Sequence, residues 1–348
     1  MKLEAERLVD WSTAYAVGRR VAGTGSVLTS LERAAMAEDF AEVVPQAEAV
    51  VSELTRLSPG GIRSRPWVMT RSQWLQANLR GFETILEPFA RKLGGADGPL
   101  APVRRHVLGA QLGGLLGYLG HRVLGQYDIF LPPDDDGLIY FVGANVAGLE
   151  RRFGFPRREF RLWIAMHEVT HRLQFGGVPW LRGHLAGLME AYLGSVDLDP
   201  KWLLESIKRA VGELRSGRAE YRGFGWVFLL MTPDQREMVK RMQAVMSLLE
   251  GHASFVMNTT ARREVPNADR FARTLHDRRH RAGVEKTFQR AIGFDVKVRQ
   301  YDLGERFVGR VVQLAGMDGL GRIWAEPANL PTIEEIGHPE AWVARVAA

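Results

Sequence analysis

The chain of 348 residues contains no cysteine. This absence excludes a disulfide framework, a thiolate zinc site, an iron–sulfur cluster and a cysteine nucleophile. Any metal ion that the protein binds must therefore be held by His, Asp or Glu side chains. The remaining composition, with 46% hydrophobic and 25% charged residues, is that of a globular protein and excludes disordered and fibrous classes.

Long apolar runs are also missing. The best membrane candidate is the uncharged stretch 107–120, whereas spanning a bilayer takes about 20 residues. The first 22 residues carry seven charged side chains, so they lack the apolar centre of a signal peptide. We therefore expect a cytoplasmic protein with no membrane partner.

Positive charge is concentrated in one part of the chain. Residues 262–299 contain 11 Lys and Arg against 5 Asp and Glu. This surplus of six positive charges equals the net charge of the whole chain, +6. No recognisable nucleic-acid-binding module surrounds this stretch. We interpret it as a solvated, Arg-rich helix face, which makes nucleic acid a disfavoured partner and leaves an anionic partner or substrate as the alternative.

The pattern of apolar residues predicts a mainly α protein with a small β-sheet. Apolar residues recur near helical spacing through the first hundred residues, whereas 138–142 is the most strand-like run. We expect an N-terminal helical region over 1–100, a catalytic core over 101–260, and a C-terminal region over 261–348 that packs with the core as one unit.

A stripe of glycines lies in the helix expected after residue 103. Gly109, Gly113 and Gly117 recur every four residues and form one bare helix face. Such a face predicts close contact with another helix, because small residues let two backbones approach. A phosphate-binding loop is the alternative, but the Walker spacing is missing.

One motif carries metal chemistry: His167, Glu168 and His171 in a helix expected over 156–175. At about 3.6 residues per turn, the two histidines are neighbours on one helix face, so both can reach the same metal ion. Glu168 lies roughly 100° around the helix, where it can act as a general base on a water at the metal. This is the division of roles in the H-E-x-x-H signature. A metal-free pair of histidines is the structural alternative.

A second long helix is expected to start near residue 233. Thr232 and Gln235 form a predicted capping box with Pro at the first helical position. Met238, Met242, Met246 and Leu249 lie along one stripe of this helix, which predicts core packing.

The third metal ligand is expected from the far end of that helix. A catalytic zinc commonly has three protein ligands and a water. Glu250 is a carboxylate in an apolar helix, where burial without a partner is unfavourable, and a metal ion would be that partner. Gly251 beside it would also let this helix and the helix of the two histidines approach closely. His252 is the competing ligand, and a salt bridge is the structural alternative for Glu250. Acids nearer in sequence stand in less apolar surroundings: Glu190, Asp197, Asp199 and Glu205.

Five segments together resemble a known family. Residues 167–171 (HEVTH), 249–253 (LEGHA) and 300–308 (QYDLGERFV) are similar to a bacterial zincin-like family, and so are 9–11 (VDW) and 330–332 (LPT). This family is labelled as hydrolases or zinc-dependent metalloproteases and is associated by name with deazaflavin coenzyme (F-420) biosynthesis.

The resemblance implies a zincin-like metalloprotease architecture. It implies His167 and His171 as zinc ligands and Glu168 as the catalytic acid and base. It also implies that strand 138–142 is an edge strand that pairs with an extended substrate.

The sequence thus predicts a zinc-dependent hydrolase of the metallopeptidase type, acting on a peptide or small amide. Tyr301, His252 and His276 are candidate donors for stabilising the oxyanion. Two alternatives are a zinc hydrolase of a non-peptide amide or ester, and a non-enzymatic helical scaffold with a structural or vestigial metal site. Assembly into a homo-oligomer stays open.

Overall fold

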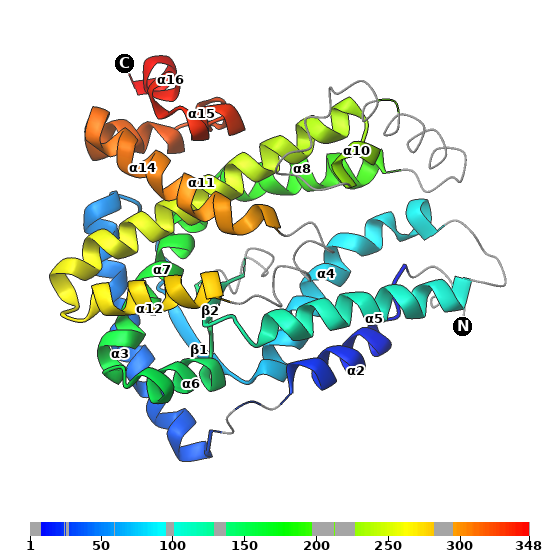
Figure 1. Cartoon of the computed structure of the whole chain (residues 1–348), viewed down its shortest axis with the longest axis horizontal. Coiled ribbons are helices and arrows are strands. Elements are labelled where there is room, and N and C mark those ends of the chain that lie inside the picture. Colours follow the sequence, from blue (N-terminus) through cyan, green and yellow to red (C-terminus); the bar gives the residue numbers. More distant parts are fainter. Residues whose placement is uncertain are drawn as a thin grey trace. The chain divides into compact units, whose positions relative to one another are not determined.

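Figure 1 shows the computed structural model of the chain. It describes residues 8–23, 25, 28–58, 60–94, 101–128, 137–196, 212, 227–281 and 295–347. The chain forms two compact units: residues 1–49 with 59–172, and residues 50–58 with 173–348. The expected boundaries near residues 100 and 260 stay predictions.

The first unit contains a small sheet and helices. Its strands are β1 (Arg65–Met69), β2 (Gly125–Tyr127) and β3 (Leu138–Val142). Its helices are α2 (Trp11–Ala22), most of α3 (Ser30–Thr55), α4 (Arg71–Gly94), α5 (Ala101–Gly120), α6 (Gly143–Phe153) and the larger part of α7 (Arg157–Gly177). The predicted mainly α class with a small sheet is confirmed.

The sheet corrects two expectations. β3 lies between the other two strands, parallel to β1 and antiparallel to β2, so the prediction that 138–142 is an edge strand is wrong. Among the strands that the structure describes, β1 and β2 lie at the two edges. β1 falls in a region expected to be helical throughout. Only its pairing with β3, some seventy residues further along the chain, defines it as a strand.

The glycine stripe of α5 packs against the backbone of α2, as predicted. A Cβ atom at Gly113 would lie 2.1 Å from the carbonyl oxygen of Ala14. A Cβ atom at Gly109 would lie 2.4 Å from the carbonyl oxygen of Asp10, the N-cap residue of α2, and one at Gly117 would lie 2.5 Å from that of Gly18. No side chain fits at these distances, so the approach of the two helices, which run side by side in Figure 1, requires glycine at all three positions.

The second unit is built around α11 (Pro233–Glu264). The capping box is confirmed: the Thr232 hydroxyl accepts from the Gln235 backbone N–H, and the Gln235 side chain accepts from the Thr232 N–H. The neighbouring elements are α8 (Leu181–Ser195), α10 (Val227–Leu230), α12 (Ala268–Arg281), α14 (Asp295–Gly321), η2 (Arg322–Trp324), η3 (Pro327–Asn329), α15 (Ile333–Gly337), α16 (Pro339–Trp342) and η4 (Val343–Ala347).

Helix α11 crosses α14 at a pair of glycines. A Cβ at Gly251 would lie 2.1 Å from the carbonyl carbon of Gly304, and a Cβ at Gly304 would lie 2.0 Å from the carbonyl oxygen of Ser247. These two glycines belong to two of the segments that carried the family resemblance. The close approach expected at Gly251 therefore exists, and its partner is α14.

The stripe predicted on α11 reaches the core only at Leu249, which is 1% exposed. Met246 is 42% exposed, and Met238 and Met242 are only half-buried. Leu249 shares the buried face with Val245, Leu248 and the residues that follow. Hydrophobic spacing alone could not decide between the two faces, because both carry apolar residues.

No helix among the described residues combines the length and the hydropathy that a membrane span requires.

Substituting Gly113 tests the contact between α2 and α5. We expect Gly113→Ala to lower the free energy of unfolding by about 1–3 kcal/mol, because the added methyl group overlaps a backbone oxygen that cannot rotate away. Gly114→Ala is the matched control: a Cβ there meets nothing within 4 Å. It should leave stability unchanged or raise it by up to about 1 kcal/mol through helix propensity. Equal thermal midpoints for the two variants would contradict the packing.

Candidate metal centre

Helix α7 carries the predicted motif and is held firmly in place. It is apolar and buried through its middle, where Phe160, Met166, Val169 and Leu173 are each no more than 3% exposed. In its first half, the Arg161 guanidinium donates to both carboxylate oxygens of Glu150, at 2.8 and 3.0 Å. A helix fixed in this way presents its side chains in a defined direction.

The two histidines of the motif lie together on one face of α7. The ring centroids of His167 and His171 are 4.8 Å apart, and the rings are perpendicular. Both side chains are half-buried, whereas the residues around them are largely buried. The helical spacing predicted this arrangement, because positions four apart are neighbours on a helix surface.

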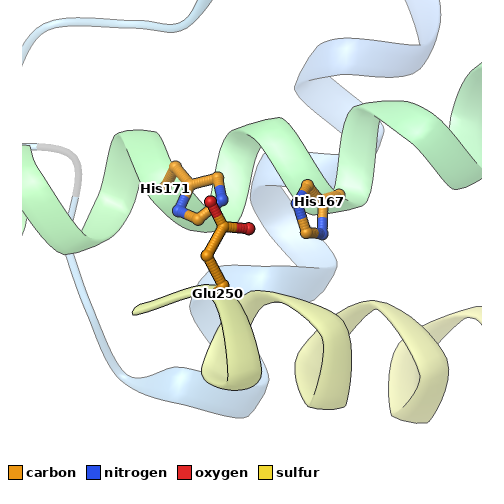
Figure 2. Close-up of side chains that lie close together, drawn as sticks. All are labelled: His167, His171 and Glu250. Carbon is orange, nitrogen blue, oxygen red and sulfur yellow. The ribbon is translucent and has the colours of Figure 1, made fainter. Parts of the chain in front are cut away.

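Glu250 lies beside this pair. One nitrogen from each of His167 and His171 and one carboxylate oxygen of Glu250 all lie within 4.8 Å of one another. Figure 2 shows the Glu250 side chain, carried by α11, pointing toward the two imidazole rings on α7. Among the described residues, this is the group of His, Asp and Glu side chains that could hold a metal ion.

The donor set fits zinc. Two imidazoles and one carboxylate are a ligand set of catalytic zinc sites, which keep a fourth position open for water. Donor atoms in a tetrahedral zinc site lie about 3.4 Å from one another, given bond lengths near 2.1 Å. Ligation by Glu250 itself stays a prediction.

Glu168 occupies a different environment from the two histidines. Its side chain is only 7% exposed, and its Oε2 accepts a hydrogen bond from the backbone N–H of Tyr127 at 3.2 Å. The edge strand β2 also contacts it at Gly125, where a Cβ would lie 2.5 Å from the Cγ of Glu168. The backbone of β2 therefore fixes where this carboxylate lies.

The strand that contacts Glu168 is itself anchored to α4. The Gln126 side chain accepts from the indole N–H of Trp74 at 2.6 Å and exchanges hydrogen bonds with the amide of Asn78. The motif in the sequence predicted Glu168. Nothing in the sequence pointed to Gly125 or Tyr127, because their role comes from a contact with a helix more than forty residues further along.

The remaining predicted site residues are placed as follows. His252 is 1% exposed and its ring lies 5.2 Å from that of Trp324. His276 is exposed on α12, and the side chain of Tyr301 lies outside the described residues. The roles of all three in stabilising an oxyanion stay predictions.

Of the acids considered as rival ligands, Glu190 is described and does not belong to this group. Glu190 is exposed on α8. Asp197, Asp199 and Glu205 lie outside the described residues.

Comparison with known proteins was made on the whole chain. The family model of the zincin-like metallopeptidases matches residues 9–343. A crystal structure from Chloroflexus aurantiacus, described as "a putative hydrolase with a novel fold", is 31% identical in sequence with a TM-score of 0.72. The match covers 97% of this chain and 98% of that one. A search of the curated proteins returns no match.

Gly125→Ala tests the position of Glu168. The added methyl group overlaps a flexible side chain rather than backbone, so we expect Glu168 to move and the fold to remain. If Glu168 is the catalytic base, the rate of hydrolysis should fall about 100-fold, which is the effect typical of displacing a catalytic group by about 1 Å. Gly148→Ala on α6 is the control, because a Cβ there meets nothing within 4 Å. Steady-state kinetics and thermal midpoints of both variants check this; unchanged activity in Gly125→Ala would contradict the assignment.

Proposed function

Since the chain belongs to the zincin-like metallopeptidase family, we propose that it is a zinc-dependent hydrolase of the metallopeptidase type. The observation that carries this proposal is the grouping of His167, His171 and Glu250, whose donor atoms lie within 4.8 Å of one another. Glu168, which follows the first histidine and is held separately by β2, supports it.

Each residue has a distinct role in the proposed reaction. His167, His171 and Glu250 would hold the ion. When bound, zinc polarises a carbonyl group and makes water more acidic. Glu168 takes a proton from the attacking water as the water oxygen bonds to the carbonyl carbon. Glu168 then passes that proton to the amine nitrogen as the carbon–nitrogen bond breaks.

The substrate class is the finer part of the proposal. A peptide fits the metallopeptidase description of the family. A non-peptide amide or ester would use the same residues, and the Chloroflexus protein is described only as a hydrolase. An association with deazaflavin coenzyme biosynthesis stays a prediction of the family resemblance alone.

Metal content tests the proposed ligands. We expect about one zinc per chain in protein purified without added metal. Glu250→Gln should weaken zinc binding by more than about 100-fold, because loss of a direct ligand exceeds the 10–100-fold effect typical of outer-shell partners. Glu190→Gln, which removes an exposed carboxylate on α8, should bind zinc as the wild type does.

Elemental analysis and competition with a chelator measure both variants. Wild-type protein that neither contains zinc nor binds it on titration would overturn the proposed function. It would favour a non-enzymatic scaffold.

The substitution Glu168→Gln distinguishes the role of the general base from the role of the metal ligands. The amide cannot accept a proton, so hydrolysis of a peptide substrate should fall about 10²–10⁴-fold while the zinc content stays at the wild-type level. His171→Ala should lose zinc and activity together. A profile of peptide, amide and ester substrates on wild-type protein comes first and supplies the assay. Full activity in Glu168→Gln would show that the mechanism is wrong.

A further inference from the structure

A third polar side chain follows the two histidines along α7. Gln174 lies seven residues after His167 and three after His171, so all three occupy one helix face. Unlike the histidines, Gln174 is fully buried at 0% exposure. A buried amide is unfavourable unless its hydrogen bonds are made, so its partners indicate what it does.

Both recorded partners of the Gln174 amide nitrogen belong to α11. The Nε2 atom donates to the Leu249 carbonyl oxygen at 3.1 Å and pairs with His252 Nδ1 at 2.9 Å. A carbonyl oxygen only accepts, so the nitrogen of the amide must face it. His252 Nδ1 is then the second acceptor, and one amide nitrogen uses its two hydrogens on two residues of the same helical turn.

These two acceptors flank Glu250. The rest of that turn is also fixed within the second unit. Gly251 packs against the backbone of Gly304, and the ring of His252 lies edge-on to Trp324. The indole N–H of Trp180 in turn donates to the Trp324 carbonyl oxygen at 3.0 Å.

The direction of the Glu250 side chain depends on how α11 is placed against α7. Each residue of a helix turns the side-chain direction by roughly 100° and advances it by about 1.5 Å. A shift of α11 by one residue would therefore point the carboxylate away from the histidines. Gln174 opposes such a shift, because its two hydrogen bonds are made to Leu249 and His252 in one register only.

We propose that Gln174 is a positioning residue that sets the register of α11 against α7, so that Glu250 faces His167 and His171. The inference rests on the proposed function, because it concerns the same zinc site. Residues that hold metal ligands in place typically change metal affinity by 10–100-fold when they are lost. Gln174 touches no reacting group, so its loss should act on the ion first.

Gln174→Met tests the proposal, since methionine has a similar shape and no amide hydrogens. We expect zinc affinity, measured by competition with a chelator, to fall about 10–100-fold. The visible absorption spectrum of protein loaded with cobalt(II) should also change, because the ligand geometry changes.

Gln235→Met is the matched control for a merely structural effect. Gln235 is also a buried glutamine, 2% exposed, whose Nε2 donates to a carbonyl oxygen, that of Ser195, at 2.9 Å. It lies four turns before Glu250 on α11. We expect a similar loss of thermal stability with wild-type zinc affinity and cobalt spectrum.

His252→Phe provides a second variant, which keeps a ring against Trp324 and removes the Nδ1 acceptor. It should weaken zinc binding in the same direction but by less, since the bond to Leu249 remains. If Gln174→Met does not fold, this variant decides, and unchanged affinity overturns the proposal.

The outcomes separate the two hypotheses. Wild-type protein that binds no zinc overturns the proposed function and the inference with it. Wild-type protein that binds zinc, with Gln174→Met binding equally well, overturns the inference alone. Equal loss of affinity in Gln174→Met and Gln235→Met also overturns it, because the effect would then be one of general stability.

Discussion

His171 follows His167 by four positions and Gln174 follows His171 by three, so the period of α7 places two imidazoles and one amide along a single line. This spacing fixes the direction of the three side chains only if the helix cannot rotate about its axis. Burial of its apolar residues and the ion pair of Arg161 with Glu150 prevent rotation. The candidate site therefore depends on the core that surrounds α7 as much as on the residues that line it.

Close approach to a glycine recurs at three places with two different consequences. At Gly113 and at Gly251, the missing side chain lets two helix backbones touch, so glycine there stabilises the packing. At Gly125, the neighbour is the side chain of Glu168, and glycine leaves room for the carboxylate that we propose as the general base. The same absence of a Cβ thus serves the fold in the first case and the chemistry in the second.

The features that the sequence predicted are those encoded within a few turns of helix. The capping box at Thr232, the glycine stripe of α5 and the histidine pair all depend on residues three or four apart. β1 was missed because its strand character comes from pairing with distant β3. The choice of Gly251's partner, α14 rather than α7, likewise depends on the tertiary arrangement.

Glu250 and Gln174 show where local reasoning ends at the site. Glu250 was predicted because a carboxylate in an apolar helix needs a partner. Gln174 occupies the same stripe as the histidines, and its position at the seventh residue after His167 is visible in the sequence. Its partners on α11 are not, since they lie seventy-five and seventy-eight residues away.

The candidate site also affects the stability of the fold, because its polar side chains are half-buried on two largely apolar helices. Placing two imidazoles and a carboxylate there is unfavourable in the absence of a partner, whereas an ion that binds only the folded chain stabilises it by mass action. At free zinc one hundred times its Kd, that stabilisation is about 2.7 kcal/mol, comparable to the burial of one large apolar side chain. The proposed ligands and Gln174, the residue proposed to position Glu250, would both change the affinity for the ion. The hydrogen bonds of Gln174 order the turn around Glu250 before the ion arrives, so less of the binding free energy is spent on ordering it. The affinity for the ion then depends on how α11 packs, because this packing sets the position of Glu250.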